Sequence, residues 1–190
     1  GGEAVLTRVD HPSGSDRVHE AVTLLDRAGR HDVVVNVQGD LPLIDPAAIR
    51  AVLAPLADPA VEIATLAAVI ADPAELAAPS VVKVAAGFAP GAASARALYF
   101  SRLPVPFGAG EHYHHIGLYA FRRAALERFV ALPRGVLEMR ESLEQLRALA
   151  AGMHIEVALV DSVPLGIDTP EDLAQARALV SDRRAAPSRP

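Results

Sequence analysis

The fold is decided by the stretch DVVVNVQGDLP at residues 32–42. Its run of β-branched valines is typical of a strand that is buried on both faces, as in a parallel sheet. In open α/β sheets, ligands bind beyond the carboxyl ends of the strands. The stretch therefore predicts an α/β fold with a polar ligand site where Asp40 follows the strand.

Apolar runs of strand length alternate with helical patterns on both sides of this stretch, which is typical of strands joined by crossover helices. Further strands are predicted at residues 4–7, 61–70, 81–85, 97–101, 116–121 and 155–160. Helices are predicted at residues 15–28, 46–55, 73–77, 122–131, 143–151 and 170–180, the first with Ser15 as its N-cap. Turns that contain Gly and Pro separate the strands between residues 81 and 121, so antiparallel pairing is expected there. One domain is expected over residues 1–180, followed by a disordered tail over residues 181–190.

The composition is that of a globular protein with an ample core. The chain has 190 residues, of which 51% are hydrophobic and 22% charged, and its net charge is −5. The absence of cysteine excludes a disulfide framework, a thiolate metal site and a Cys nucleophile. A mildly acidic chain does not favour nucleic-acid binding, and no apolar run reaches membrane-spanning length. We therefore expect no membrane insertion, and a cytoplasmic location because no leader pattern opens the chain.

Two acidic residues, Asp40 and Asp168, each lie beyond a predicted strand. Mg²⁺ binds one or two protein carboxylates together with phosphate oxygens of a substrate, so these two acids could share one metal site. Two other roles stay open on the sequence alone. Asp40 could bond its own backbone in a turn, and Asp168 could cap the next helix, although Thr169 already supplies a cap.

Three other segments carry polar residues that could face a ligand. The small-residue turn SGSDR at residues 13–17 opens a helix, and its N–H groups could bind an anion or a base edge, unless Ser15 is simply a cap. Along HYHHIGLY at residues 112–119, strand alternation places His115, Gly117 and Tyr119 on one face. The segment LEQLR at residues 143–147 mixes polar residues with core leucines, as an exposed helix face does.

Zinc is not favoured at the histidine-rich segment. His112 and His114 have a spacing that could suggest it, but no third ligand of the usual pattern is nearby.

Seven stretches together resemble the 3-deoxy-manno-octulosonate cytidylyltransferase family. They occur in the order found in that family, from residue 1 to about residue 180. They are TRVDHPSGSDR (7–17), VNVQGD (35–40), VVKV (81–84), LYFSR (98–102), HIGLY (115–119), LEQLR (143–147) and DTPEDL (168–173).

The resemblance implies a Rossmann-like nucleotidyltransferase fold, with a mixed, mostly parallel central sheet flanked by helices, and a homodimer. It implies transfer of a cytidylyl group from CTP to 3-deoxy-D-manno-octulosonate (Kdo), with release of pyrophosphate, for lipopolysaccharide synthesis. By motif position, the resemblance implies that Mg²⁺ is bound by Asp40 and Asp168. It implies that cytidine lies against Gly14, Ser15, Asp16 and Arg17. The sugar-acid pocket that it implies consists of Gln38, Arg102, His115, Tyr119, Glu144 and Gln145.

The chain departs from the family pattern in two places. Members of the family begin with a strand and a basic, Gly-rich loop that holds the triphosphate, so the chain resembles an N-terminally truncated member and is expected to lack activity by itself. Leu41 stands where the family usually carries an acid. Two alternatives therefore stay open: a cytidylyltransferase for another acidic sugar, and a non-catalytic remnant that binds a sugar acid or dimerises.

Overall fold

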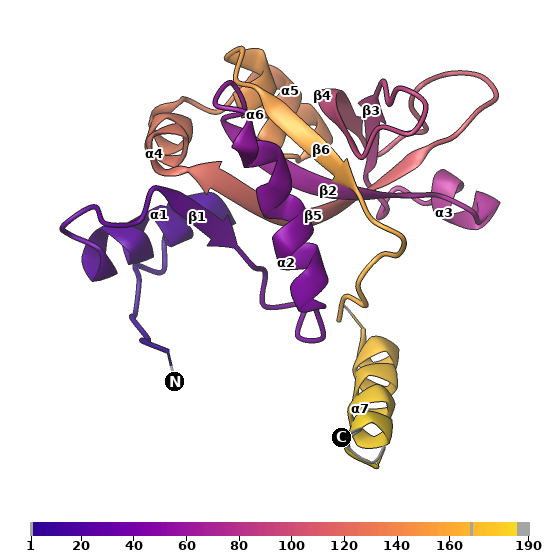
Figure 1. Cartoon of the computed structure of the whole chain (residues 1–190), viewed down its shortest axis with the longest axis horizontal. Helices are drawn as coiled ribbons and strands as arrows, with labels where there is room; N and C mark the ends of the chain where they lie inside the picture. The colour runs from indigo at the N-terminus through magenta and orange to yellow at the C-terminus, as the bar shows by residue number, and fades with distance from the viewer. Residues whose placement is uncertain (1, 168, 186–190) are drawn as a thin grey trace.

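The computed structural model describes residues 2–167 and 169–185 (Figure 1). Its sheet consists of β1 (Val33–Asn36), β2 (Ile63–Val69), β3 (Lys83–Ala86), β4 (Ser94–Ser101), β5 (Tyr113–Arg122) and β6 (Ile155–Leu159). Its helices are α1 (Gly14–Leu25), α2 (Pro46–Leu53), the 3₁₀ helix η1 (Ala54–Ala57), α3 (Pro73–Ala77), α4 (Arg123–Ala131), α5 (Val136–Glu141), α6 (Gln145–Ala150) and α7 (Pro170–Ala185).

The sheet is mixed, as expected, but it is not mostly parallel. The strand order is β1-β5-β2-β6-β4-β3, and β3 also pairs with β5, which closes a ring. Within the described residues, β2 and β6 form the one parallel pair. β5 runs antiparallel to β1, β2 and β3, and β4 runs antiparallel to β3 and β6. An open Rossmann-type sheet has no such closure.

The prediction of a mostly parallel sheet was wrong because of how β2 is buried. Ile63 and Ala67 face one core cluster, whereas Ala64 and Leu66 face another, so the strand is buried on both faces. A strand covered in this way is apolar at nearly every position, whether its neighbours run parallel or antiparallel. The antiparallel pairing expected between residues 81 and 121 is confirmed for β3 and β4.

Helices cover both faces of the sheet. Apolar side chains of α1, α4 and α6 pack into the first core cluster, and those of α2 and η1 pack into the second. Figure 1 shows α2 crossing the sheet on one side, while α7 lies at the end of the molecule farthest from β3 and β4. No helix in the described part of the chain is both long and apolar enough to span a membrane.

Three local predictions differ from the structure. The strand expected at residues 4–7 does not form, and Leu6 is almost fully exposed there. Helix α1 is capped by Ser13, not Ser15, because Ser13 accepts a hydrogen bond from the Asp16 N–H and donates one to the Asp16 carboxylate. Helix α7 continues to Ala185, into the segment expected to be a tail, and residues 186–190 lie outside the described residues.

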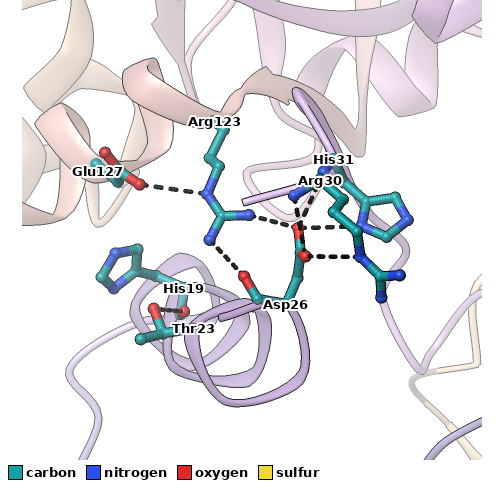
Figure 2. A network of polar contacts seen from close by, with 7 residues as sticks. All are labelled: His19, Thr23, Asp26, Arg30, His31, Arg123 and Glu127. Carbon is teal, nitrogen blue, oxygen red and sulfur yellow. Dashed lines mark hydrogen bonds and ion pairs between the residues drawn. The ribbon is translucent and has the colours of Figure 1, made fainter. Parts of the chain in front are cut away.

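Asp26 joins the C-terminal end of α1 to the start of α4 (Figure 2). Its carboxylate accepts hydrogen bonds from the N–H groups of Arg30 and His31, and Arg123 Nη1 lies 2.6 Å from its Oδ2. These bonds lower the pKa of Asp26 below its ordinary value of 3.8, the two backbone bonds most strongly. The network fixes the turn between α1 and β1, which leads the chain toward Gln38.

Candidate active site

A cavity of about 330 Å³ brings together segments that are far apart in the sequence. It is lined by Gly14, Gln38, Ser80, Val82, His114, His115, Gly117, Tyr119, Ser142, Leu143, Glu144 and Gln145. The start of α1, the loop after β1, the strand β5 and the connection between α5 and α6 all contribute to it. Five of the six residues expected in a sugar-acid pocket are in this set, and Gly14 of the expected nucleotide segment is too.

Strand β5 supplies His115, Gly117 and Tyr119 from one face, as alternation predicts. Its pairing with β2 is interrupted by a bulge, since Thr65 lies opposite Tyr119 but Leu66 lies opposite Ile116. Bulges re-aim side chains and are common beside ligand sites. Here, His115 and Tyr119 remain close to each other, with ring centroids 5.5 Å apart.

The two rings are uncharged at neutral pH. Burial, with a smaller contribution from His114, lowers the pKa of His115 to about 3. Burial and the nearby Glu144 charge raise the pKa of Tyr119 well above 10. The Tyr119 hydroxyl forms no hydrogen bond with any residue that the structure describes. It therefore remains a neutral phenol that can donate to a ligand.

Glu144, expected in the sugar-acid pocket, contacts Ser15, which was expected in the nucleotide-binding segment. Its Oε1 accepts a hydrogen bond of 2.8 Å from the hydroxyl of Ser15, which is fully buried in α1. Its Oε2 is buried and has no hydrogen-bond partner among the described residues. A buried carboxylate oxygen without a partner is costly, so this atom points to a hydrogen-bond donor on a ligand.

The amide side chains at the end of β1 and in the loop that follows it show the same feature. Gln38 Nε2 donates to Asn36 Oδ1 at 2.9 Å, whereas Asn36 Nδ2 is buried and unpartnered within the described part of the chain. A Cβ atom added to Gly14 would lie 3.6 Å from Gln38 Nε2, so the start of α1 lies beside this amide. Polar groups thus converge on the cavity from two sides.

Arg102 is the predicted pocket residue that does not line the cavity. Its guanidinium donates to the carbonyl oxygens of Glu141, Pro79 and Ser142, at 2.8, 3.0 and 3.5 Å. Ser142 lines the cavity and has a left-handed backbone conformation with φ 56°. Arg102 therefore supports the wall of the cavity from behind.

The remaining residues of the expected nucleotide segment contact the chain near its start. Asp16 accepts from the hydroxyl of its N-cap Ser13, and Arg17 donates to the Thr7 hydroxyl and the Arg8 carbonyl. The structure therefore brings Gly14 into the cavity and buries Ser15 behind it, but it places Asp16 and Arg17 outside.

Asp40 is exposed in the turn after β1, and its carboxylate has no hydrogen bond or ion pair with the described residues. Asp168 lies outside the described residues. The residue before it, Ile167, donates its N–H to the Asp40 carbonyl at 2.9 Å, so the two segments meet. No group of three or more His, Asp or Glu side chains that could hold a metal occurs in residues 2–167 and 169–185. A free carboxylate nevertheless fits Mg²⁺, which needs only one or two when a substrate supplies phosphate oxygens.

Sequence reasoning missed several residues of the site, above all Thr65 and Asn36. Thr65 is the single polar residue of β2, and a lone hydroxyl inside an apolar strand could have marked it. The volume of a cavity alone does not identify the site. A larger cavity of about 530 Å³ between α1 and β1 has mainly apolar surroundings and holds none of the predicted site residues.

Comparison with known proteins agrees with this geometry. A profile of the family described as "Cytidylyltransferase" matches residues 1–155. The chain is 64% identical to the 3-deoxy-manno-octulosonate cytidylyltransferase of Paramagnetospirillum magneticum over 95% of this chain and 73% of that protein. It is 63% identical to the enzyme of the same name from Methylobacterium radiotolerans, over 97% of this chain and 74% of that protein.

The chain belongs to the cytidylyltransferase family.

Two solved structures have folds similar to that of this family member. The structure of CMP:2-keto-3-deoxy-manno-octonic acid synthetase complexed with CTP matches with a TM-score of 0.85 and 39% identity, over 96% of this chain and 74% of that one. A 4-diphosphocytidyl-2C-methyl-D-erythritol synthase, only 14% identical, matches with a TM-score of 0.55 over 90% and 68%. The second likeness concerns the fold alone. The architecture is thus an α/β nucleotidyltransferase fold with a mixed sheet.

Proposed function

We propose that this cytidylyltransferase transfers a cytidylyl group from CTP to Kdo and releases pyrophosphate. The observation that carries the proposal is the 330 Å³ cavity, on which five of the expected sugar-pocket residues converge. Kdo is a carboxylate with several hydroxyl groups. A cavity with a neutral phenol, a neutral imidazole, two amides and an unpartnered carboxylate oxygen suits such a ligand.

The residues of the cavity act by binding and positioning. The Tyr119 phenol donates a hydrogen bond, and the free Glu144 oxygen accepts one. Gln38 and Gln145 bind hydroxyls through their amides. The anomeric hydroxyl of Kdo then attacks the α-phosphorus of CTP. An oxygen–phosphorus bond forms, the bond to pyrophosphate breaks, and the hydroxyl proton passes to solvent water. Catalysis rests on alignment and electrostatics, with no covalent enzyme intermediate.

We propose Mg²⁺ as the cofactor, with Asp40 and Asp168 as its carboxylate ligands. The exposed Asp40 carboxylate and the bond from Ile167 to the Asp40 carbonyl support this assignment. When bound, the metal would neutralise phosphate charge and make the sugar hydroxyl more acidic.

Asp40→Asn tests the metal assignment. In the full-length protein it removes one charge with little change of shape, so Mg²⁺-dependent pyrophosphate release should fall about tenfold or more, while thermal unfolding stays the same. Asp45→Asn is the matched control, because Asp45 caps α2 nearby and Asn caps equally well. Equal activity of the Asp40→Asn variant and the control would contradict the assignment.

We also propose that the protein acts in the cytoplasm, where it consumes CTP, and that it forms a homodimer. Large apolar side chains support the dimer, since Phe107 is fully exposed and Leu98 and Leu103 are 67% and 68% exposed. They lie in β4 and in the loop that follows it.

A substrate panel tests the proposed reaction. Pyrophosphate release by the full-length protein should require both CTP and Kdo, and a sialic acid in place of Kdo should give little. Comparable release with the sialic acid would favour a cytidylyltransferase for another acidic sugar. Binding of Kdo without any CTP-dependent release would favour a non-catalytic sugar-acid-binding protein.

A further inference from the structure

The hydroxyl of Thr65 lies at the centre of a buried polar cluster beneath the cavity. Its Oγ1 is 3.0 Å from His115 Nε2, 3.1 Å from the Ile116 carbonyl oxygen and 3.0 Å from the Leu118 carbonyl oxygen. Thr65 is fully buried, and His115 is 8% exposed.

The bulge in β5 creates this cluster. The register shift leaves Gly117 and Leu118 without residues opposite them in β2. The carbonyls of Ile116 and Leu118 then turn toward the same point of β2, which is occupied by the Thr65 hydroxyl. A valine, of the same shape, would leave both carbonyls without this donor.

A count of protons fixes the direction of the hydrogen bond to His115. A hydroxyl has one hydrogen, and carbonyl oxygens can only accept. If the Thr65 hydrogen pointed to His115, its oxygen lone pairs would face two carbonyl oxygens at about 3 Å. The hydrogen therefore serves the carbonyls, and the Thr65 oxygen accepts from His115 Nε2–H.

We propose that Thr65 is a positioning residue that holds His115 in the Nε2–H tautomer, so that Nδ1 accepts a hydrogen bond from a hydroxyl of the ligand in the cavity. That the ligand is a sugar acid rests on the proposed function. The assignment of the tautomer rests only on the contacts of Thr65. Because burial keeps His115 neutral, only one ring nitrogen carries a proton. Nδ1 forms no hydrogen bond with the residues described, and the ring itself lines the cavity.

The aromatic neighbours restrict the orientation of the ring. Phe100 contacts His115 edge to face, with centroids 4.8 Å apart, and the ring of Tyr119 is tilted against that of His115 with centroids 5.5 Å apart. The ring is thus held between the rings of Phe100 and Tyr119, and by Thr65 at one nitrogen. Fixing a neutral histidine in one tautomer in this way sets which nitrogen can accept.

Nitrogen-15 NMR of the full-length protein tests the tautomer without any substrate. With ¹⁵N-labelled histidine, and with His115→Gln to assign the signals, Nε2 of His115 should give a shift typical of a protonated ring nitrogen. Nδ1 should give the shift of an unprotonated one. Added Kdo should move the Nδ1 signal. A proton on Nδ1 in the wild-type protein would overturn the proposal.

Two variants test the role of Thr65. Thr65→Val should give a mixture of tautomers and raise KM for Kdo about fivefold to tenfold, with KM for CTP unchanged. Thr65→Ser keeps the hydroxyl and should restore the wild-type NMR pattern and KM. If Thr65→Val fails to fold, the wild-type spectrum and Thr65→Ser still decide the matter. Equal increases of both KM values in a folded Thr65→Val would show a merely structural role and overturn the proposal.

The failure of the proposed function would look different. Suppose that the wild-type protein has the Nε2–H tautomer but that added Kdo does not shift the Nδ1 signal. The role of Thr65 in fixing the tautomer would then stand, and Kdo would be excluded as the ligand.

Discussion

Ser15 lies where the expected nucleotide segment meets the sugar pocket. Its sequence context suggested a helix cap or a cytidine contact, but Ser13 caps the helix and the Ser15 hydroxyl bonds Glu144. A cap can be recognised from the sequence because it acts on its own helix. The bond to Glu144 could not be predicted, because it spans 129 positions of the chain.

We expect Ser15→Ala to weaken Kdo binding more than CTP binding. The variant leaves Glu144 Oε1 without its donor, so the carboxylate can turn away from the ligand, and a lost bond to a buried carboxylate costs about 1–3 kcal/mol. Calorimetry with each substrate measures the effect, which should be a fall of about tenfold in Kdo affinity.

Ser94→Ala is the matched control for Ser15→Ala. Ser94 also donates to a glutamate, Glu156, at 2.8 Å, but it joins β4 to β6 away from the cavity. The control should leave the affinity for Kdo unchanged. Equal loss of Kdo affinity in both variants would contradict the role given to Ser15.

At the scale of elements, the segment from α5 to α6 is held by a buried ion pair. Arg147 Nη2 and Nε lie 2.8 and 3.0 Å from the two Glu138 oxygens, and both side chains are 4% exposed. Burial alone would raise the pKa of Glu138, but the hydrogen bonds from Arg147, Gly135 and Arg134 outweigh it and lower the pKa. The connection between these helices carries Ser142 and Glu144 into the cavity.

Arg147→Met should lower the free energy of unfolding by about 3 kcal/mol, because the buried Glu138 carboxylate then keeps only the partly exposed Arg134 and the Gly135 N–H as partners. Urea unfolding measures this change. The double variant Glu138→Gln with Arg147→Met removes the stranded charge and should be less destabilised than Arg147→Met alone. A double variant that is less stable than Arg147→Met would contradict the explanation.

The contact between α1 and α4 has a predictable pH dependence. The pKa of Asp26 is lower in the folded protein than its ordinary value of 3.8, chiefly because it accepts hydrogen bonds from the Arg30 and His31 N–H groups (Figure 2). A lowered pKa stabilises the fold above the ordinary value, and this stabilisation is lost as the pH falls toward the folded value. Asp26→Asn should therefore be less stable than wild type at pH 7, and the difference should shrink below about pH 4.

Denaturant unfolding at several pH values measures that difference. Asp32→Asn, a nearby exposed acid, is the control and should follow the wild type at every pH. A constant difference between Asp26→Asn and wild type from pH 7 to pH 3 would contradict the explanation.

Local signals predicted most elements, but not how the elements pair. Asp45 followed by Pro46 marks the start of α2, and the valine run marks β1; both predictions are confirmed. The closed ring was not predictable, because β5 must pair with three strands and no local pattern specifies three partners. The apolar stretch at residues 4–7 looks like a strand but pairs with none of the described residues, and Leu6 stays exposed.

In the candidate site, too, local features were predictable and contacts between distant segments were not. His115 and Tyr119 were expected on one face because strand alternation is local, and both line the cavity. The backing residue Thr65 was missed because its contact depends on the β5 bulge. Arg102 was expected on the cavity wall, but three backbone carbonyls on neighbouring segments bind its guanidinium instead.

At the scale of the whole molecule, the proposed homodimer can be tested at its exposed apolar surface. Phe107→Asp places a charge where an apolar contact is expected and should convert a dimer into a monomer, as measured by light scattering after size exclusion. Val9→Asp is the control, because Val9 is 95% exposed near the start of the chain, and it should remain dimeric. A wild-type monomer, or a dimeric Phe107→Asp, would contradict this interface.

In the proposed function, the 330 Å³ cavity binds the sugar acid during CTP-dependent transfer. The most direct test is the steady-state kinetics of Tyr119→Phe, with Tyr113→Phe as the control, since Tyr113 lies in the same strand but does not line the cavity. In the full-length protein, Tyr119→Phe should raise KM for Kdo about tenfold and leave KM for CTP unchanged, whereas Tyr113→Phe should change neither. An equal rise in both KM values for Tyr119→Phe, or no change in the KM for Kdo, would contradict it.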